Sequence, residues 1–331
     1  MHEEESNALK AKHVITILLG ILAIGCPFIL TGIYLRQLLI LFVIFSILAL
    51  SLDIILGYMG QFSFGHQVAL GFGAYTVGFF SVMWRISPSP WLSLIASIGI
   101  GAAFGLIVGL VALKATRGVY LAIITFGVGK ILRTYFYVLP EVTGGSRGIQ
   151  LIPSLAVPSL KFDTQISFYY LALGCLIFTA YLITRWLHSP FGRAVVAIRE
   201  NEDLAKSTGI NSYKYYVMAF TLSTALAGFS GSLYAFYMKS ITPALFNIDY
   251  MLMMLIMVIV GGSGTIGGPI LGAAIYVFGL NLIPIRKEFA LVVFGGILLA
   301  CIIFLPRGIY PYLKELLSGY GEQRQSDRVK G

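Results

Sequence analysis

The sequence has very little charge. Asp, Glu, Lys and Arg make up only 11% of the 331 residues, whereas 58% are hydrophobic, and the mean hydropathy is +0.87. A soluble domain has about 25% charged residues, because charge is needed to coat a surface that faces water. The shortage excludes a soluble globular protein and predicts an all-α, multispanning membrane protein.

Residues that hold metals or nucleotides are also scarce. The three cysteines, Cys26, Cys175 and Cys301, lie in separate apolar runs and fit no zinc spacing. The glycine-rich stretch GGSGTIGG (261–268) lacks the lysine of a P-loop. No paired carboxylates, metal cluster or Ser/His dyad occur at comparable depth. We therefore expect no catalytic residue, no metal and no cofactor on this chain.

Long apolar runs dominate what is present. A membrane-spanning helix needs about 20 apolar residues. Ten candidate spans satisfy this length or come close to it: 14–35, 38–56, 61–84, 91–113, 118–139, 166–184, 214–237, 246–262, 265–284 and 289–306. The first run is longer than the core of a signal peptide and no cleavage site follows it, so we expect it to remain as a span.

The distribution of lysine and arginine orients these spans. If residues 1–13 form a cytoplasmic tail, 14 of the 23 Lys and Arg residues fall in inside segments and half as many fall outside. Positive charge accumulates on the cytoplasmic side, so both tails, 1–13 and 307–331, are expected there, with a transmembrane domain at 14–306. The net charge of +9 then reflects topology, and no nucleic-acid partner is expected.

Two loops between spans are unusually long. Residues 140–165 lie outside in this orientation, and their TGGSRG stretch and three prolines predict a partly ordered lid or vestibule. Residues 185–213 lie inside, and the residues after Pro190 predict a short helix that ends near Gly209. Such an amphipathic helix can lie on lipid headgroups or dock into a groove of another protein.

The third candidate span opens with GYMGQFSFGH (57–66), which a helix does not favour. Non-helical backbone survives at membrane depth only inside protein or against water. A second glycine-rich segment, 261–279, has a similar pattern, which indicates either an internal repeat or simply the abundance of glycine in membrane helices. The candidate pathway residues are Tyr58, Gln61, Ser63, His66, Gly261, Gly264 and Thr265. A proton-carrying role for His66 is weighed against a hydrogen bond to a helix break, and the structural role is favoured.

Four stretches together resemble one protein family. They are GYMGQFSFGHQVALGFGAYT, GVYLAIITFGVGKILR with VTGGSRGI, SPFGRAVVAIRENEDLAKSTGINSYKYYVMAFTLSTALAGFSGSLYA, and GGSGTIGGPILGA, and the likeness runs from about residue 45 to 306. This combination resembles the LivM-type permease subunit of branched-chain amino-acid ABC transporters.

The resemblance implies a ten-helix permease of the type II importer architecture in the inner membrane of a bacterium or archaeon. It implies as partners a paralogous permease that forms a heterodimer with this chain, two cytoplasmic ATPases that bind ATP and Mg, and a periplasmic or extracellular substrate-binding protein. The loop between spans six and seven becomes the coupling helices. Its candidate ATPase-coupling residues are Arg193, Arg199, Glu200, Glu202, Ala205 and Gly209.

Three charges fall within or at the edge of spans: Asp53, Lys130 and Arg133. Asp53 and Lys130 depart from the family pattern, are opposite in sign, and are hypothesised to pair, the alternative being that Asp53 meets cytoplasmic water. Arg133 matches the pattern. Stabilising the outer vestibule is weighed against snorkelling to the interface, and snorkelling is favoured.

The resemblance leaves three functions to compare. The first is import of branched-chain or other apolar amino acids driven by ATP. The second keeps the architecture and imports urea or a short amide. The third, an ion-coupled secondary transporter, would require intramembrane carboxylates, of which Asp53 alone is a reasonable candidate.

Overall fold

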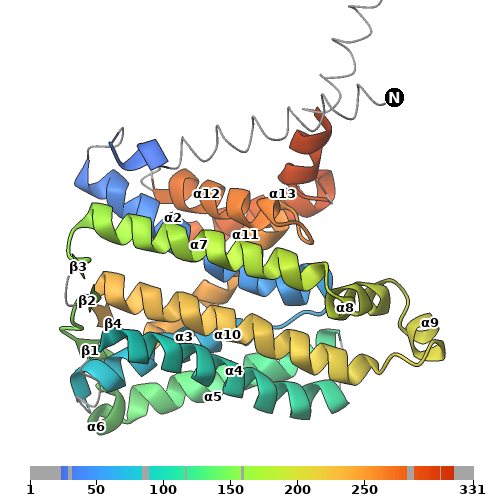
Figure 1. The fold of residues 1–331 in the computed structure, drawn as a ribbon, viewed down its shortest axis with the longest axis horizontal. Coiled ribbons are helices and arrows are strands. Elements are labelled where there is room, and N and C mark those ends of the chain that lie inside the picture. Colours follow the sequence, from blue (N-terminus) through green and yellow to red (C-terminus); the bar gives the residue numbers. More distant parts are fainter. Residues whose placement is uncertain are drawn as a thin grey trace, which may run out of the picture.

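The computed structural model describes residues 24–28, 32–83, 89–115, 118–157, 160–281, 287–305 and 307–316. In this part the chain forms a bundle of long helices that run roughly parallel or antiparallel to each other (Figure 1). Short strands and α6 lie at one end of the bundle, and α8 and α9 lie at the other. We call the second the α8 end.

The helices follow one another along the chain with short connections. The principal elements are α2 (Ile33–Asp53), η1 (Ile54–Tyr58), α3 (His66–Gly78), η2 (Phe79–Met83), α4 (Pro90–Ala115), α5 (Val119–Val138), α7 (Gln165–Leu187), α8 (Pro190–Glu200), α9 (Glu202–Ser207), α10 (Ser212–Met238), α11 (Ile248–Gly261), α12 (Gly267–Asn281) and α13 (Lys287–Phe304). Within the described chain, five helical segments are long and apolar enough to cross a membrane: Ile33–Tyr58, Pro90–Lys114, Tyr120–Val138, Gln165–Leu187 and Ser212–Met238.

From the second expected span onward, each span coincides with one of these helices, with its ends shifted by a few residues. In its described part the chain is therefore predominantly helical, with helices at the expected membrane spans. The first expected span, 14–35, lies mostly outside the described residues, as do the tail 1–13 and most of the tail 307–331. The total of ten spans stays a prediction.

The third span differs from a plain helix, as its glycines predict. The α-helix α2 continues directly into the π-helical turn η1. Residues 59–65 are then non-helical, and α3 begins at His66. Gly60 has a φ of +67°, which favours a residue without a Cβ. The helix therefore starts five residues later than the expected boundary at 61.

Helices α2, α3 and α10 form the buried centre, and α4, α5 and α7 expose most of their surface. The centre packs through small residues. A Cβ on Gly73 of α3 would run into the carbonyl oxygen of Gly228 on α10, and one on Gly231 would run into that of Leu70. Ser97 of α4 donates a hydrogen bond to the Gly73 carbonyl oxygen at 2.9 Å. Backbone contact of this kind is how membrane helices associate without a hydrophobic driving force.

The long loop 140–165 is partly ordered, as expected. It contains α6 (Pro140–Thr143), the 3₁₀ turn η3 (Gly145–Arg147) and three short strands, β1 (Ile149–Gln150), β2 (Ala156–Val157) and β3 (Leu160–Lys161). Strand β1 pairs antiparallel with β4 (Ser240–Ile241), and β2 pairs with β3. A 3₁₀ turn, η4 (Pro243–Phe246), follows β4. The loop is thus tied to the chain that leaves α10.

The close contact between α3 and α10 predicts the effect of one substitution. Gly73→Val should destabilise the purified protein by roughly 1–3 kcal/mol, because the new side chain must push two backbones apart. Gly174→Val on α7 is the matched control, since nothing lies within 4 Å of a Cβ there. Thermal unfolding in detergent measures both variants, and equal midpoints would contradict this account of the packing.

Candidate functional site

The two glycine-rich segments meet at the α8 end of the bundle. A Cβ on Gly57 would overlap both the backbone nitrogen of Gly264 and the carboxylate of Asp53. Asp53 is fully buried, and its Oδ1 accepts a hydrogen bond from the Gly264 N–H at 2.8 Å. Gly264 has a φ of +75°, so its amide is turned out of any helix and needs an acceptor. Segments 211 residues apart in sequence thus share one partly buried hydrogen bond.

Arg199, at the end of α8, completes this arrangement. Its Nη1 donates a hydrogen bond to the carbonyl oxygen of Gly57. The Arg199 side chain lies along Gly60, where a Cβ would be 3.0 Å from its Cγ, and Nη1 would be 3.4 Å from a Cβ on Gly264. We call Asp53, Gly57, Gly60, Arg199 and Gly264 the glycine junction. It joins α8 to both interrupted segments.

The C-terminal part of the described chain packs on the same place. A Cβ on Gly262 would be 2.9 Å from Cδ of Pro311, and one on Gly308 would overlap the backbone of Gly262. Gly267 faces the ring of Tyr310 in the same way. The segment after α13 therefore lies at the α8 end, next to the glycine junction.

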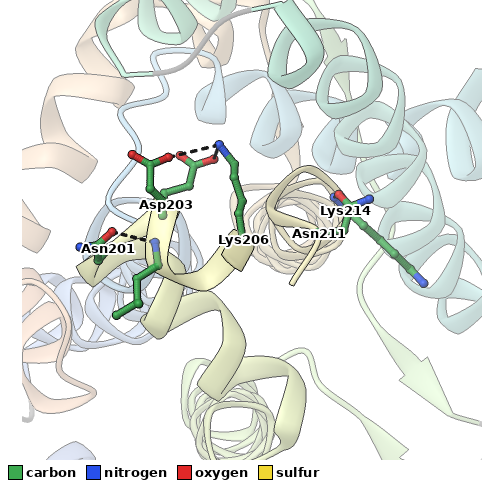
Figure 2. A network of polar contacts seen from close by, with 7 residues as sticks. Asn201, Asp203, Lys206, Asn211 and Lys214 are labelled. Atoms are coloured by element: carbon green, nitrogen blue, oxygen red, sulfur yellow. Dashed lines mark hydrogen bonds and ion pairs between the residues drawn. The ribbon is translucent and has the colours of Figure 1, made fainter. Parts of the chain in front are cut away.

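The expected short helix after Pro190 is in fact two helices, α8 and α9. Asn201 separates them with extended backbone, because its Oδ1 accepts the Leu204 N–H at 3.0 Å and so caps α9 (Figure 2). Asn211 caps α10 in the same way through the Lys214 N–H, at 3.2 Å. Gly209, with a φ of +84°, ends α9, as its expected cap role requires.

The two helices present different faces. On α8, the apolar side chains of Val195 and Ile198 are buried against the bundle, so they are not available to a partner protein. On α9, Leu204 is 64% exposed and Ala205 is buried. Lys206 pairs with Glu202 at 3.1 Å and with Asp203 at 3.8 Å (Figure 2). The outer surface therefore combines one apolar side chain with a charged cluster.

The other expected coupling residues lie on the same surface. Arg193 and Glu200 are exposed on α8, and Arg193 Nη1 donates to the carbonyl oxygen of His188 at 2.6 Å. That contact fixes the corner between α7 and α8. Whether these residues meet an ATPase stays a prediction.

The expected pathway residues of the first segment lie inside the bundle. Gln61 is buried and its Oε1 accepts the Gly118 N–H at 2.7 Å, next to the start of α5. Ser63 is buried and lies 3.5 Å from the Gly65 nitrogen, and the Phe64 N–H donates to Thr125 Oγ1 at 2.9 Å. These side chains pair the non-helical backbone, which explains why it is tolerated at this depth. That they line an aqueous path stays a prediction.

His66 joins three helices. It is fully buried at the start of α3, and its Nε2 lies 3.0 Å from Ser51 Oγ on α2 and 3.5 Å from Ser223 Oγ on α10. Ser223 Oγ in turn donates to the Ser51 carbonyl oxygen. This geometry fits the structural role that the sequence favoured for the histidine.

The remaining pathway candidates lie at the glycine junction. Tyr58 is half-buried at the end of η1. Gly261 is buried where a Cβ would overlap the Gly268 carbonyl oxygen, so α11 and α12 touch backbone to backbone. Thr265 Oγ1 donates to the Gly262 carbonyl oxygen at 2.9 Å and accepts the Gly268 N–H at 3.0 Å, which stabilises the turn into α12.

The hypothesised pair of Asp53 and Lys130 is not formed. Asp53 is buried against Gly264, whereas Lys130 is exposed on α5 with its Nζ 5.5 Å from the centroid of the Phe126 ring. The alternative, contact of Asp53 with cytoplasmic water, is also wrong for the chain as described, because the side chain is fully buried. Arg133 is half-buried, and its snorkelling stays a prediction.

Sequence reasoning missed the contacts of the glycine junction. It assigned Asp53, Gly264 and Arg199 to three separate groups, although all three meet at Gly57. The available signal was local: Asp53 stands four residues before Gly57, one helical turn away on the same face.

Comparison with known proteins decides the family. Residues 34–302 match the model of a protein family described as "Branched-chain amino acid transport system / permease component". The chain belongs to this permease family. It is 30% identical over 309 residues to the high-affinity branched-chain amino acid transport system permease protein LivM of Salmonella typhimurium, covering 86% of this chain and 72% of the relative.

Two further relatives extend the picture. The LivM protein of Escherichia coli K12 is 29% identical, over 95% of this chain and 78% of its own length. The LivH permease of S. typhimurium is 26% identical, over 80% and 90%. No solved structure matches the chain. The relatives are named as transport permeases, so this LivM-type permease is a transport protein and not an enzyme.

The buried carboxylate of Asp53 predicts a clear order of stability. Asp53→Leu should destabilise the permease by about 1–3 kcal/mol, because the partly buried Gly264 amide loses its acceptor. Asp53→Asn keeps an acceptor of the same size and should retain most of the stability. Thermal unfolding in detergent compares the two. A leucine variant as stable as the asparagine variant would show that the hydrogen bond contributes nothing.

Proposed function

We propose that this chain is the membrane-spanning permease subunit of an ATP-driven importer for branched-chain or other apolar amino acids. The family match and the LivM relatives support the cargo. The observation that carries the mechanism is the hydrogen bond from Arg199 to the Gly57 carbonyl oxygen, because it attaches a surface helix directly to an interrupted span.

In this mechanism α8 and α9 dock on an ATPase subunit in the cytoplasm. The exposed Leu204 and the charged cluster around Lys206 supply the contact, and α8 transmits the movement. Because Arg199 and Asp53 both bond to backbone in the glycine-rich segments, a shift of α8 displaces both segments together. The permease rocks between outward and inward openings as ATP binds and leaves the partner subunits.

The relatives support one further part of the proposed complex, the second permease. LivH and LivM are separately named permeases and both resemble this chain, which supports a heterodimer of two related permeases. Two cytoplasmic ATPases would bind ATP and Mg, and an external binding protein would deliver the amino acid. The β1–β4 pair and α6, at the end opposite α8, provide an ordered surface for that delivery (Figure 1).

The experiment measures uptake by membrane vesicles that hold the permease with its paralogue, ATPases and binding protein. Labelled leucine and labelled urea are compared, with ATP and with an ion gradient alone. ATP-dependent leucine uptake supports the proposal. Urea uptake driven by ATP would keep the mechanism and replace the cargo. Uptake with the gradient alone would overturn the ATP-driven mechanism.

The coupling step makes a separate prediction for Arg199. Arg199→Met keeps the length of the side chain but removes its donors, and a hydrogen bond from a charged group is worth about 1.5–3 kcal/mol. Leucine uptake should fall roughly tenfold or more. ATP hydrolysis by the complex should continue, because the Met variant leaves the docking surface of α9 unchanged.

Lys214→Met is the matched control for this variant. Lys214 is exposed at the start of α10, next to the same loop, and also carries one positive charge (Figure 2). The Lys214→Met variant should keep leucine uptake and ATP hydrolysis within about twofold of the unchanged permease, since an exposed charge away from a specific contact contributes little. Equal losses in the two variants would mean that general surface charge, and not the Gly57 contact, carries the coupling.

A further inference from the structure

Lys130 is a charged residue in an unexpected place. It lies near the middle of α5, a helix long and apolar enough to span the membrane, and its side chain is exposed. At 1.5 Å per residue it stands about 16 Å from the start of α5 and about 12 Å from its end. A lysine at this depth is expensive unless it faces water, a partner or a counter-charge.

In the structure the side chain of Lys130 does not extend toward the nearer end of α5. The Lys130 ammonium lies over the ring of Phe126, one turn back toward the start of α5 and so toward the centre of the span. Among the described residues no carboxylate forms an ion pair with it. The cation is therefore held at mid-depth by an aromatic ring, with its outer side open.

The face around Lys130 is apolar with two further features. Ile123, two turns before Lys130, lies on the same side of the helix and is 60% exposed, and Ile131, the next residue around the helix, is 70% exposed. Gly127, one turn before Lys130, leaves open space, because nothing lies within 4 Å of a Cβ there. Thr134, one turn after, is exposed and its hydroxyl donates to the Lys130 carbonyl oxygen at 3.0 Å. We call Ile123, Gly127, Lys130, Ile131 and Thr134 the α5 face.

We propose that the α5 face lines the translocation pathway between two permease chains, and that Lys130 binds the carboxylate of the passing amino acid. This rests on the proposed function. A cation beside open space matches the carboxylate, and the flanking isoleucines match a branched apolar side chain. A charge-assisted hydrogen bond to a single lysine is strong enough to orient the substrate and weak enough to release it.

The first test measures leucine uptake at a subsaturating concentration in the ATP-loaded vesicles. Lys130→Gln should lower uptake about tenfold, because it removes a charge-assisted contact. Lys130→Arg should retain most uptake. Arg133→Gln, which removes the other positive charge of α5, should have a smaller effect than Lys130→Gln.

Two further readouts separate the possible causes of a loss. The complex carrying Lys130→Gln should assemble with its paralogue, and loaded binding protein should still stimulate its ATPase activity. Unchanged leucine uptake would overturn the proposal. Failure to assemble would also overturn it, since Lys130 would then pair with an acidic residue of the partner permease. Absence of ATP-driven leucine uptake by the unchanged permease would instead contradict the proposed function.

The second test does not depend on the cargo. Cysteines introduced as Lys130→Cys and Thr134→Cys should react with an anionic, membrane-impermeant thiol reagent in assembled complexes. Ile177→Cys is the control, because Ile177 is 62% exposed on the membrane-spanning α7 and has no charged neighbour in its turn. The permease with only its three natural cysteines gives the background. Reaction at position 130 no faster than at 177 would place the α5 face in lipid and overturn the proposal.

Discussion

This structure depends on one constraint: backbone N–H and C=O groups inside a membrane domain must find hydrogen-bond partners within the protein. Two segments of the chain abandon the helix within the membrane domain, and each leaves N–H and C=O groups that lipid cannot satisfy. The carboxylate of Asp53 and the guanidinium of Arg199 supply the missing partners at Gly264 and Gly57. A buried carboxylate is costly, and the hydrogen bond that Oδ1 accepts from the Gly264 amide offsets part of this cost.

In the proposed mechanism the same constraint also links structure to transport. Because Arg199 belongs to α8 and Gly57 belongs to an interrupted span, the bond that satisfies the backbone also connects the surface helix to the interior. Glycine is needed at Gly57 for close approach, since any Cβ would overlap the Asp53 carboxylate and the Gly264 nitrogen. The glycine junction therefore solves a folding problem, and in the proposed mechanism it is also the connection through which α8 moves the two glycine-rich segments.

Much of the fold could be predicted from apolar runs and glycine clusters. The expected spans from residue 38 onward, the non-helical start at 57–65 and the cap at Gly209 follow from local rules of length, backbone freedom and capping. The break at Asn201 was not predicted, because a single Asn competes weakly with a helix until tertiary contacts on both sides fix it. The prediction that Asp53 pairs with Lys130 was wrong for a related reason. Opposite charges suggest a pair, but a backbone amide far away in sequence leaves no compositional signal.

The candidate site was predicted as a set of residues but not as an arrangement. Gln61, Ser63 and His66 were recognised as polar groups near a helix break, and the structure shows which backbone groups and serines they reach. The positions of these side chains depend on which helices pack together through their small residues. A single sequence does not show which helices those are.

The central claim is that α8 and the two glycine-rich segments move as one body. Spin labels at Ala197 on α8 and Ser263 in the second segment, both exposed, report their separation, and a label at Gln150 marks the opposite end. Pulsed electron paramagnetic resonance on the assembled complex, with and without ATP, measures these distances. The account predicts a constant distance from 197 to 263 while both distances to 150 change. A distance from 197 to 263 that changes with ATP would contradict it.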